Sequence, residues 1–153
     1  MTNREVVRTW CQKINYEAVL PLLAVDKDRV VADATLHREK RGWMSHVARV
    51  RVSVDPDARG RGLASMLIQE FIDIVPKFGV CTLDAEILDE QKAAMKIFEG
   101  LHFVNVATLP QHALDLNRKA HDLHVYSLNV VPPERLAVDP DEDLSQVDVG
   151  EGG

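Results

Sequence analysis

The sequence has little of what marks secreted, membrane-embedded or nucleic-acid-binding proteins. Two of its 153 residues are cysteines, Cys11 and Cys81, and neither belongs to a Cys-x-x-Cys pair, so no disulfide framework is expected. No apolar run approaches the roughly 20 residues that cross a bilayer. The N-terminus also lacks the basic and then apolar residues of a signal peptide. We therefore expect a cytoplasmic protein that does not associate with membranes.

Excess charge is also missing from most of the chain. The net charge is −6, and residues 131–153 alone hold seven acidic residues and one basic residue. The rest of the chain is neutral overall, which argues against a general nucleic-acid binder. Aromatic residues make up only 5% of the chain, so any core must be mostly aliphatic. We expect one folded domain over residues 1–130 and a disordered acidic tail over residues 131–153.

What the sequence does contain is a regular succession of helix and strand patterns. Strands are predicted over residues 20–25, 30–36, 43–54, 80–88, 103–108 and 124–130, and helices over residues 3–15, 62–75 and 90–101. The connection 109–122 is polar and shows no clear pattern. Because the strand 43–54 leads through a helix to the strand 80–88, this pair is expected to be parallel. The predicted fold class is α/β (α+β), a mixed and mostly antiparallel sheet with a central parallel pair, flanked by helices.

Within the strand 43–54, side chains alternate between the two faces. Val50, Val52 and Val54 point one way, and Arg49, Arg51 and Ser53 point the other way.

The most informative segment follows that strand and reads Arg59-Gly60-Arg61-Gly62-Leu63-Ala64. Glycines let the backbone bend and let a ligand approach the chain closely. The first amides of a helix have no intrahelical partner, and the helix dipole adds positive charge there. The two arginines supply full charges. The segment predicts a seat for a phosphate or pyrophosphate, and a glycine turn with solvated arginines is the plain alternative.

Other phosphate-binding motifs fit this segment less well. A P-loop requires Lys and then Ser or Thr after its last glycine, where this chain has Leu63-Ala64. A Rossmann fingerprint requires a third glycine, where Ser65 stands, and its loop follows the first strand of the sheet. A dinucleotide site is therefore the weaker hypothesis.

Two segments together resemble the GNAT superfamily of N-acetyltransferases. Val52-Ser53-Val54-x-Pro56-x-x-Arg59-Gly60-Arg61-Gly62-Leu63-Ala64 is similar to the family's Arg/Gln-x-x-Gly-x-Gly/Ala signature after a strand. Gln91-x-x-Ala94-x-x-Ile97-Phe98-Glu99-x-Leu101-x-Phe103 is similar to its Asn-x-x-Ala-x-x-Leu-Tyr-x-x-Leu-Gly-Phe segment. The resemblance covers roughly residues 3–130.

The resemblance implies acetyl-CoA, or another acyl-CoA, as the acyl donor and a primary amine as the acceptor. It implies that Val52 and Val54 offer main-chain groups to the pantetheine arm and that the amides from Arg59 to Ala64 hold the pyrophosphate. The implied cofactor-binding residues are Val52, Ser53, Val54, Arg59, Gly60, Arg61, Gly62, Leu63, Ala64, Ser65, Gln91 and Phe98. A non-catalytic acyl-CoA-binding module of the same fold is the alternative.

Acyl transfer to an amine also requires a group that accepts the amine's proton. Glu86 is the first candidate base, and Asp84 shares its strand face by alternation. Where the family commonly has a tyrosine that protonates the leaving thiolate, this chain has Phe98, so Tyr126 on the last strand is the candidate substitute. The amide of Val54 or Ser53 is the candidate donor to the oxyanion.

The chain departs from the family at its start, because the family usually has a strand and a helix before the helix matched to residues 3–15. A missing first strand exposes the edge of its neighbour. We therefore expect a chain that is less stable than a full-length member or that forms a homodimer. A metal site is not expected, since His121 and His124 are three apart on a strand and no Cys/His/Asp cluster has zinc spacing.

Overall fold

The computed structural model describes residues 18–39 and 41–132. The predicted helix over residues 3–15 and the acidic segment from residue 133 onward lie outside this range. Within it, the strands are β1 (Val19–Asp26), β2 (Arg29–Arg38), β3 (Val47–Val54), β4 (Thr82–Leu88), β5 (Val104–Leu114) and β6 (Ala120–Asn129). The helices are α2 (Leu63–Ile74) and α3 (Lys92–Gly100), with short 3₁₀ turns η1 (Pro56–Ala58) and η2 (Val75–Phe78).

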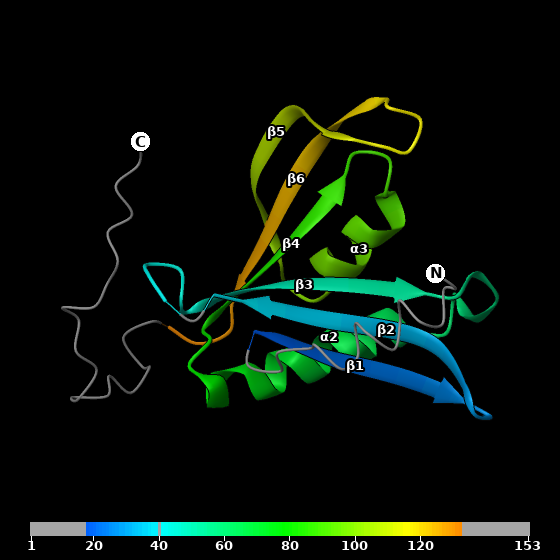
Figure 1. Ribbon diagram of the computed structural model, residues 1–153, viewed down its shortest axis with the longest axis horizontal. Helices are drawn as coiled ribbons and strands as arrows, with labels where there is room; N and C mark the ends of the chain where they lie inside the picture. Colours follow the sequence, from blue (N-terminus) through cyan, green and yellow to red (C-terminus); the bar gives the residue numbers. More distant parts are fainter. Residues whose placement is uncertain (1–17, 40, 133–153) are drawn as a thin grey trace, which may run out of the picture.

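These strands form one sheet in the order β1-β2-β3-β4-β6-β5 (Figure 1). Only β3 and β4 pair in parallel, and the other neighbours pair antiparallel. The predicted mixed sheet with a central parallel pair is therefore confirmed. Among the described residues, no helix is long and apolar enough to cross a membrane.

Two of the predicted boundaries are wrong. The connection 109–122 is mostly strand, because β5 continues to Leu114 and β6 begins at Ala120. Alternation is hidden there because nearly every β5 side chain is exposed on the outermost strand. The carboxylate of Asp115 then shapes the hairpin turn by accepting the N–H groups of Asn117 and Lys119 at 2.8 and 2.9 Å. At the other boundary, residues 43–46 form turns rather than the start of β3, with Val47 N–H bonded to the Met44 carbonyl.

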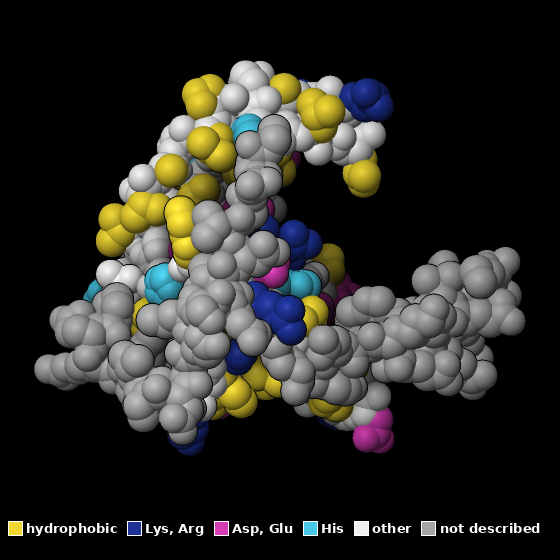
Figure 2. Space-filling model, turned by 60° about the vertical axis from the view of Figure 1, so that its left-hand side comes forward, with side chains coloured by type: hydrophobic (Ala, Val, Ile, Leu, Met, Phe, Trp, Pro, Cys, Tyr) yellow, Lys and Arg dark blue, Asp and Glu magenta, His cyan; other side chains and the backbone are white. Residues whose placement is uncertain are grey.

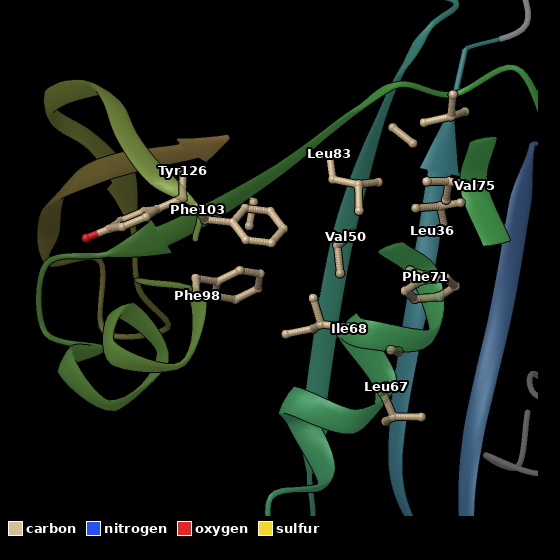
Figure 3. Packing of buried hydrophobic residues seen from close by; sticks show 14 of the residues in the cluster. Leu36, Val50, Leu67, Ile68, Phe71, Val75, Leu83, Phe98, Phe103 and Tyr126 are labelled. Atoms are coloured by element: carbon tan, nitrogen blue, oxygen red, sulfur yellow. The ribbon is translucent and has the colours of Figure 1, made fainter. Parts of the chain in front are cut away.

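The core lies between the sheet and its two helices. Helix α2 packs on β1, β2 and β3, because Leu67, Ile68 and Phe71 recur on one helical face and are almost fully buried. Figure 3 shows Phe71 and Leu36 packed together on this side of the core. At the α3 side, the rings of Phe98 and Phe103 meet edge to face with centroids 5.0 Å apart (Figure 3).

The two halves of the sheet part from each other between β3 and β4. Their parallel pairing covers only Val47 with Thr82, Ala48 with Leu83, and Arg49 with Asp84. Beyond these residues the strands diverge toward their carboxyl ends (Figure 1). The fold therefore leaves an opening in the middle of the sheet, at the end where the glycine segment begins.

Candidate functional site

The glycine segment enters α2 with a left-handed backbone conformation and an open surface. Gly60 and Gly62 have φ angles of +80° and +75°, which L residues with a side chain rarely adopt. Nothing lies within 4 Å of a Cβ built at either position, so backbone conformation rather than packing calls for glycine. Gly62 is the N-cap of α2 and contributes no side-chain cap. The first amides of α2, at Leu63, Ala64 and Ser65, are therefore available to a ligand.

Charged residues hold this segment in place. Arg61 pairs with Asp26 of the β1–β2 turn at 3.5 Å. Asp55 pairs with Arg29 and accepts the N–H of Asp57 at 3.0 Å, which caps η1. The hydrogen bond from Asp57, followed by the charges of Arg29 and Arg59, holds the pKa of Asp55 below its usual value. Both ion pairs thus reach the β1–β2 hairpin, through Asp26 at the end of β1 and Arg29 at the start of β2, while the helix amides stay open.

The end of β3 presents main-chain groups to the opening beside β4. The N–H of Asp55 donates to the Val31 carbonyl on β2. Because backbone groups alternate between the two edges of a strand, those of Ser53 also face β2, whereas those of Val52 and Val54 face β4. No β3–β4 pairing uses them, since the ladder ends at Arg49. Of the two amides predicted as oxyanion donors, the Val54 amide is the one that faces the opening.

A cavity of about 390 Å³ occupies this opening. Its charged lining residues are Arg49 and Arg51 of β3 and Glu86 of β4, and Gln91 and Phe98 line it from the α3 side. Most of the other lining residues are aliphatic. A second cavity of about 430 Å³ lies next to it. Arg49 lines both cavities, and His37 and Asp84 line only the second one.

The two candidate carboxylates have different partners. The guanidinium of Arg49 lies 3.2 Å from the Glu86 carboxylate, and the Glu86 side chain remains about one-third exposed. The Ser127 hydroxyl donates to Asp84 at 2.6 Å. Only Glu86 lines the cavity that adjoins the free edge of β3. Asp84 shares its strand face, as the alternation predicts, but lines the neighbouring cavity.

The remaining predicted residues lie on the α3 side of the site. The side-chain oxygen of Gln91 accepts the Leu88 N–H at 2.9 Å, so Gln91 fixes the end of β4. Tyr126 is 3% exposed, and its hydroxyl donates to Glu99 at 3.0 Å. Burial and this carboxylate raise the pKa of Tyr126. Tyr126 is paired with Ala85 and so belongs to the opposite sheet face from Glu86, and it does not line the cavity.

A cluster of one histidine and two carboxylates, which the sequence did not reveal, connects the β4–α3 loop to the β5–β6 hairpin. His121 is 2% exposed, and its Nδ1 and Nε2 lie 2.9 and 3.0 Å from Asp89 and Asp115. The hydrogen bond with Asp115, followed by the one with Asp89, raises the pKa of His121. The same bonds lower the pKa values of both carboxyl groups. In the part of the chain that the structure describes, no three His, Cys, Asp or Glu side chains are placed to hold a metal ion.

The model of the acetyltransferase (GNAT) family matches residues 2–103. The chain belongs to the GNAT acetyltransferase family. YwnH of Bacillus subtilis, whose name assigns it provisionally to phosphinothricin acetylation, is 33% identical over 78 residues. That alignment covers 51% of this chain and 47% of YwnH, so the chain spans about half the length of this relative.

Solved GNAT structures share the fold over most of the chain. An N-acetyltransferase from Staphylococcus aureus Mu50 superposes with a TM-score of 0.74 at 25% identity, over 86% of this chain and 79% of its own. The structure of yncA from Salmonella typhimurium, which contains its cofactor acetyl-CoA, also gives 0.74 at 19% identity, over 85% and 75% of the two chains. The resemblance read from the glycine and α3 segments is therefore confirmed at the level of family and fold.

Membership of the GNAT family does not by itself identify Arg49 and Arg51 as residues of the candidate site. From alternation alone, Arg49 and Arg51 could be placed only on the strand face opposite to that of Val50, Val52 and Val54. The signal that would have found them is the pair of arginines at alternate positions near the end of the strand that leads into the glycine segment. What the sequence could not show is that Arg49 reaches Glu86 across the opening.

Proposed function

We propose that this protein is an N-acetyltransferase that transfers the acetyl group of acetyl-CoA to a primary amine. The observation that carries the proposal is the unpaired edge of β3 at Val52 and Val54, which lies between a cavity and an open helix N-terminus. This combination offers an extended main-chain surface to a thioester arm and amides to a pyrophosphate. The acetyl-CoA found in the yncA structure supports the same assignment.

The cofactor would be held by groups of three kinds. The amides of Leu63, Ala64 and Ser65, together with the charges of Arg59 and Arg61, would bind the pyrophosphate. The main-chain groups of Val52 and Val54 would bind the pantetheine arm. Phe98 and Gln91 would bound the cavity that receives the thioester. Each of these groups is present without rearrangement of the sheet.

In the proposed reaction, the neutral amine attacks the thioester carbonyl and a C–N bond forms. Glu86, directly or through a water molecule, accepts the proton that the nitrogen loses. The Val54 amide faces the opening and donates to the oxyanion of the tetrahedral intermediate. The C–S bond then breaks and CoA leaves as a thiolate, whose parent thiol has a pKa of about 8.5. A protein acid is thus helpful but not required, and Tyr126 is left out because its hydroxyl is engaged by Glu99.

The test combines cofactor binding with turnover. Acetyl-CoA is expected to raise the melting temperature of the protein, and NAD is not. Acetyl-CoA with a mixed panel of amines is expected to release free thiol and to yield acetylated products. Protection by acetyl-CoA without turnover of any amine would instead support the non-catalytic acyl-CoA-binding module.

That the protein forms a homodimer remains a prediction. Both outer strands of the described sheet, β1 and β5, expose large apolar side chains, with Leu23, Val25 and Val104 each more than half exposed. Unpaired strand edges of this kind favour association. Light scattering of the full chain in solution would give the mass directly, and a monomer at all concentrations would contradict the prediction.

A further inference from the structure

The cavity between β3 and β4 carries more positive charge than amine acetylation requires. Its charged lining residues are Arg49, Arg51 and Glu86. Because Arg49 already pairs with Glu86 at 3.2 Å, the charge of Arg51 has no counterpart among the described residues that line the cavity. An alkylammonium ion entering this cavity would be repelled unless the same molecule also carried a negative charge.

The arginines share the sheet face that lies away from α2. In the register of β2 and β3, His37 lies opposite Arg49 and Thr35 lies opposite Arg51. Burial, followed by the charges of Arg51 and Arg49, lowers the pKa of His37, so this imidazole adds no charge of its own at neutral pH. Figure 2 shows basic side chains gathered with acidic and histidine side chains in a hollow below the overhanging upper part of the molecule.

The proposed cofactor does not account for this charge. Its phosphates would sit at the N-terminus of α2, where Arg59 and Arg61 are the nearby basic residues of the glycine segment. Val52 and Val54 pack toward the core on the α2 side. By alternation, the side chain of Arg51 points to the other side of the sheet. The pantetheine arm that would cross the opening is uncharged, so an anion bound by the exposed side chain of Arg51 would come from the second substrate.

Resting on the proposed function, we infer that the acceptor is an amine that also carries an acidic group, such as an amino acid. Arg51 binds the acidic group, and the amine lies toward Glu86 in the same cavity. A guanidinium offers parallel N–H donors that match both oxygens of a carboxylate. Positive charge thus selects for zwitterionic or anionic acceptors against simple alkylamines.

The first experiment is a competition among matched acceptors. The protein and acetyl-CoA are incubated with a pool of amino acids, their carboxamides and the corresponding amines without a carboxyl group, and acetylated products are identified by mass spectrometry. We expect acetylated products mainly from the amino acids that keep their carboxyl group. Equal or faster acetylation of the carboxamides and plain amines would overturn it.

Failure of the proposed function gives a different result in the same experiment. A pool without any product, while acetyl-CoA still raises the melting temperature, overturns the proposed transferase function together with the inference about the acceptor and supports the non-catalytic acyl-CoA-binding module. A pool without product and without protection by acetyl-CoA overturns the proposed function itself.

The second experiment tests Arg51 directly. R51Q is expected to lower kcat/KM for the preferred acid by roughly ten- to a hundredfold, mainly through KM, because a charge-assisted hydrogen bond is lost. It should leave kcat/KM for the matching carboxamide unchanged, and R51K should restore part of the loss. K77Q, which removes a remote charge from η2, is the matched control and should change neither value. A larger KM for acetyl-CoA with an unchanged KM for the acid would overturn the assignment.

Discussion

The guanidinium of Arg49 lies 3.2 Å from the carboxylate of Glu86, across the point where β3 and β4 part. Arg49 is also the last β3 residue that pairs with β4, through Asp84. The ion pair therefore spans the place where the sheet opens and holds the proposed base at the mouth of the cavity. It ties the position of the proposed base to the geometry of the sheet itself.

The first prediction concerns Glu86 as the base. E86Q keeps the size and hydrogen-bonding capacity of the side chain but cannot accept a proton, so kcat should fall by about 10²- to 10⁴-fold. The KM for acetyl-CoA should change little, because Glu86 is not among the groups proposed to bind the cofactor. Steady-state kinetics measures both values.

Asp84 provides the matched control for this prediction. D84N removes the other candidate carboxylate on the same strand face and loses part of its bond with Ser127. If Glu86 is the base, D84N should retain most of the activity. The opposite order of losses would move the role to Asp84.

The second prediction concerns the backbone of the glycine segment. G62A should lower the free energy of unfolding by about 1–2 kcal/mol, because alanine at a φ of +75° is strained even in open space. It should also weaken acetyl-CoA binding, since relief of the strain would move the α2 amides. Chemical denaturation and calorimetric titration measure the two effects.

A second Gly→Ala variant tests the cause of that effect. Gly100 lies at the end of α3 without a positive φ angle, and nothing lies within 4 Å of a Cβ built there. G100A should therefore be neutral or stabilising, by up to about 1 kcal/mol, with unchanged acetyl-CoA affinity. Equal destabilisation by both variants would contradict the argument from φ.

The sequence predicted the order of the described elements and the glycine segment because those features are local. Alternation revealed β3, helical spacing revealed α2, and Gly60 and Gly62 mark positions of positive φ. Side-chain contacts between residues that lie far apart in the sequence could not be predicted in this way. Arg49 meets Glu86, and His121 meets Asp89 and Asp115, only after the chain has folded. The second half of β5 and the start of β6 were missed because an outermost strand with exposed side chains has no buried face to impose alternation.

The third prediction concerns Tyr126. Y126F removes the hydrogen bond to Glu99 and should lower the free energy of unfolding by about 1 kcal/mol, because the exposed carboxylate can regain water. The kcat should stay within about twofold of the wild-type value, since the phenol does not line the cavity. A large loss of kcat in a variant of undiminished stability would instead make Tyr126 an acid in the reaction.

The last prediction concerns the pH dependence of stability through His121. Hydrogen bonds to Asp115 and Asp89 raise its pKa above the ordinary 6.5, so its contribution is complete below that value. The contribution is lost as the pH rises through the folded-state pKa. The two carboxyl groups have lowered pKa values, so their contribution is present above the ordinary 3.8 and is lost as the pH falls through the folded-state values.

The wild-type protein should therefore gain most from this cluster between about pH 4 and pH 6.5. H121Q cannot take up the proton, so the stability difference between wild type and H121Q should be larger near about pH 5.5 than near about pH 9. His37, whose lowered pKa changes the stability with pH in the opposite direction, is present in both proteins, so its contribution cancels from this difference. H124Q is the control on the same strand, since His124 bonds to the uncharged side chains of Asn105 and Thr108. Denaturation curves at both pH values measure the effect, and a difference that is constant with pH would show that folding does not raise the pKa of His121.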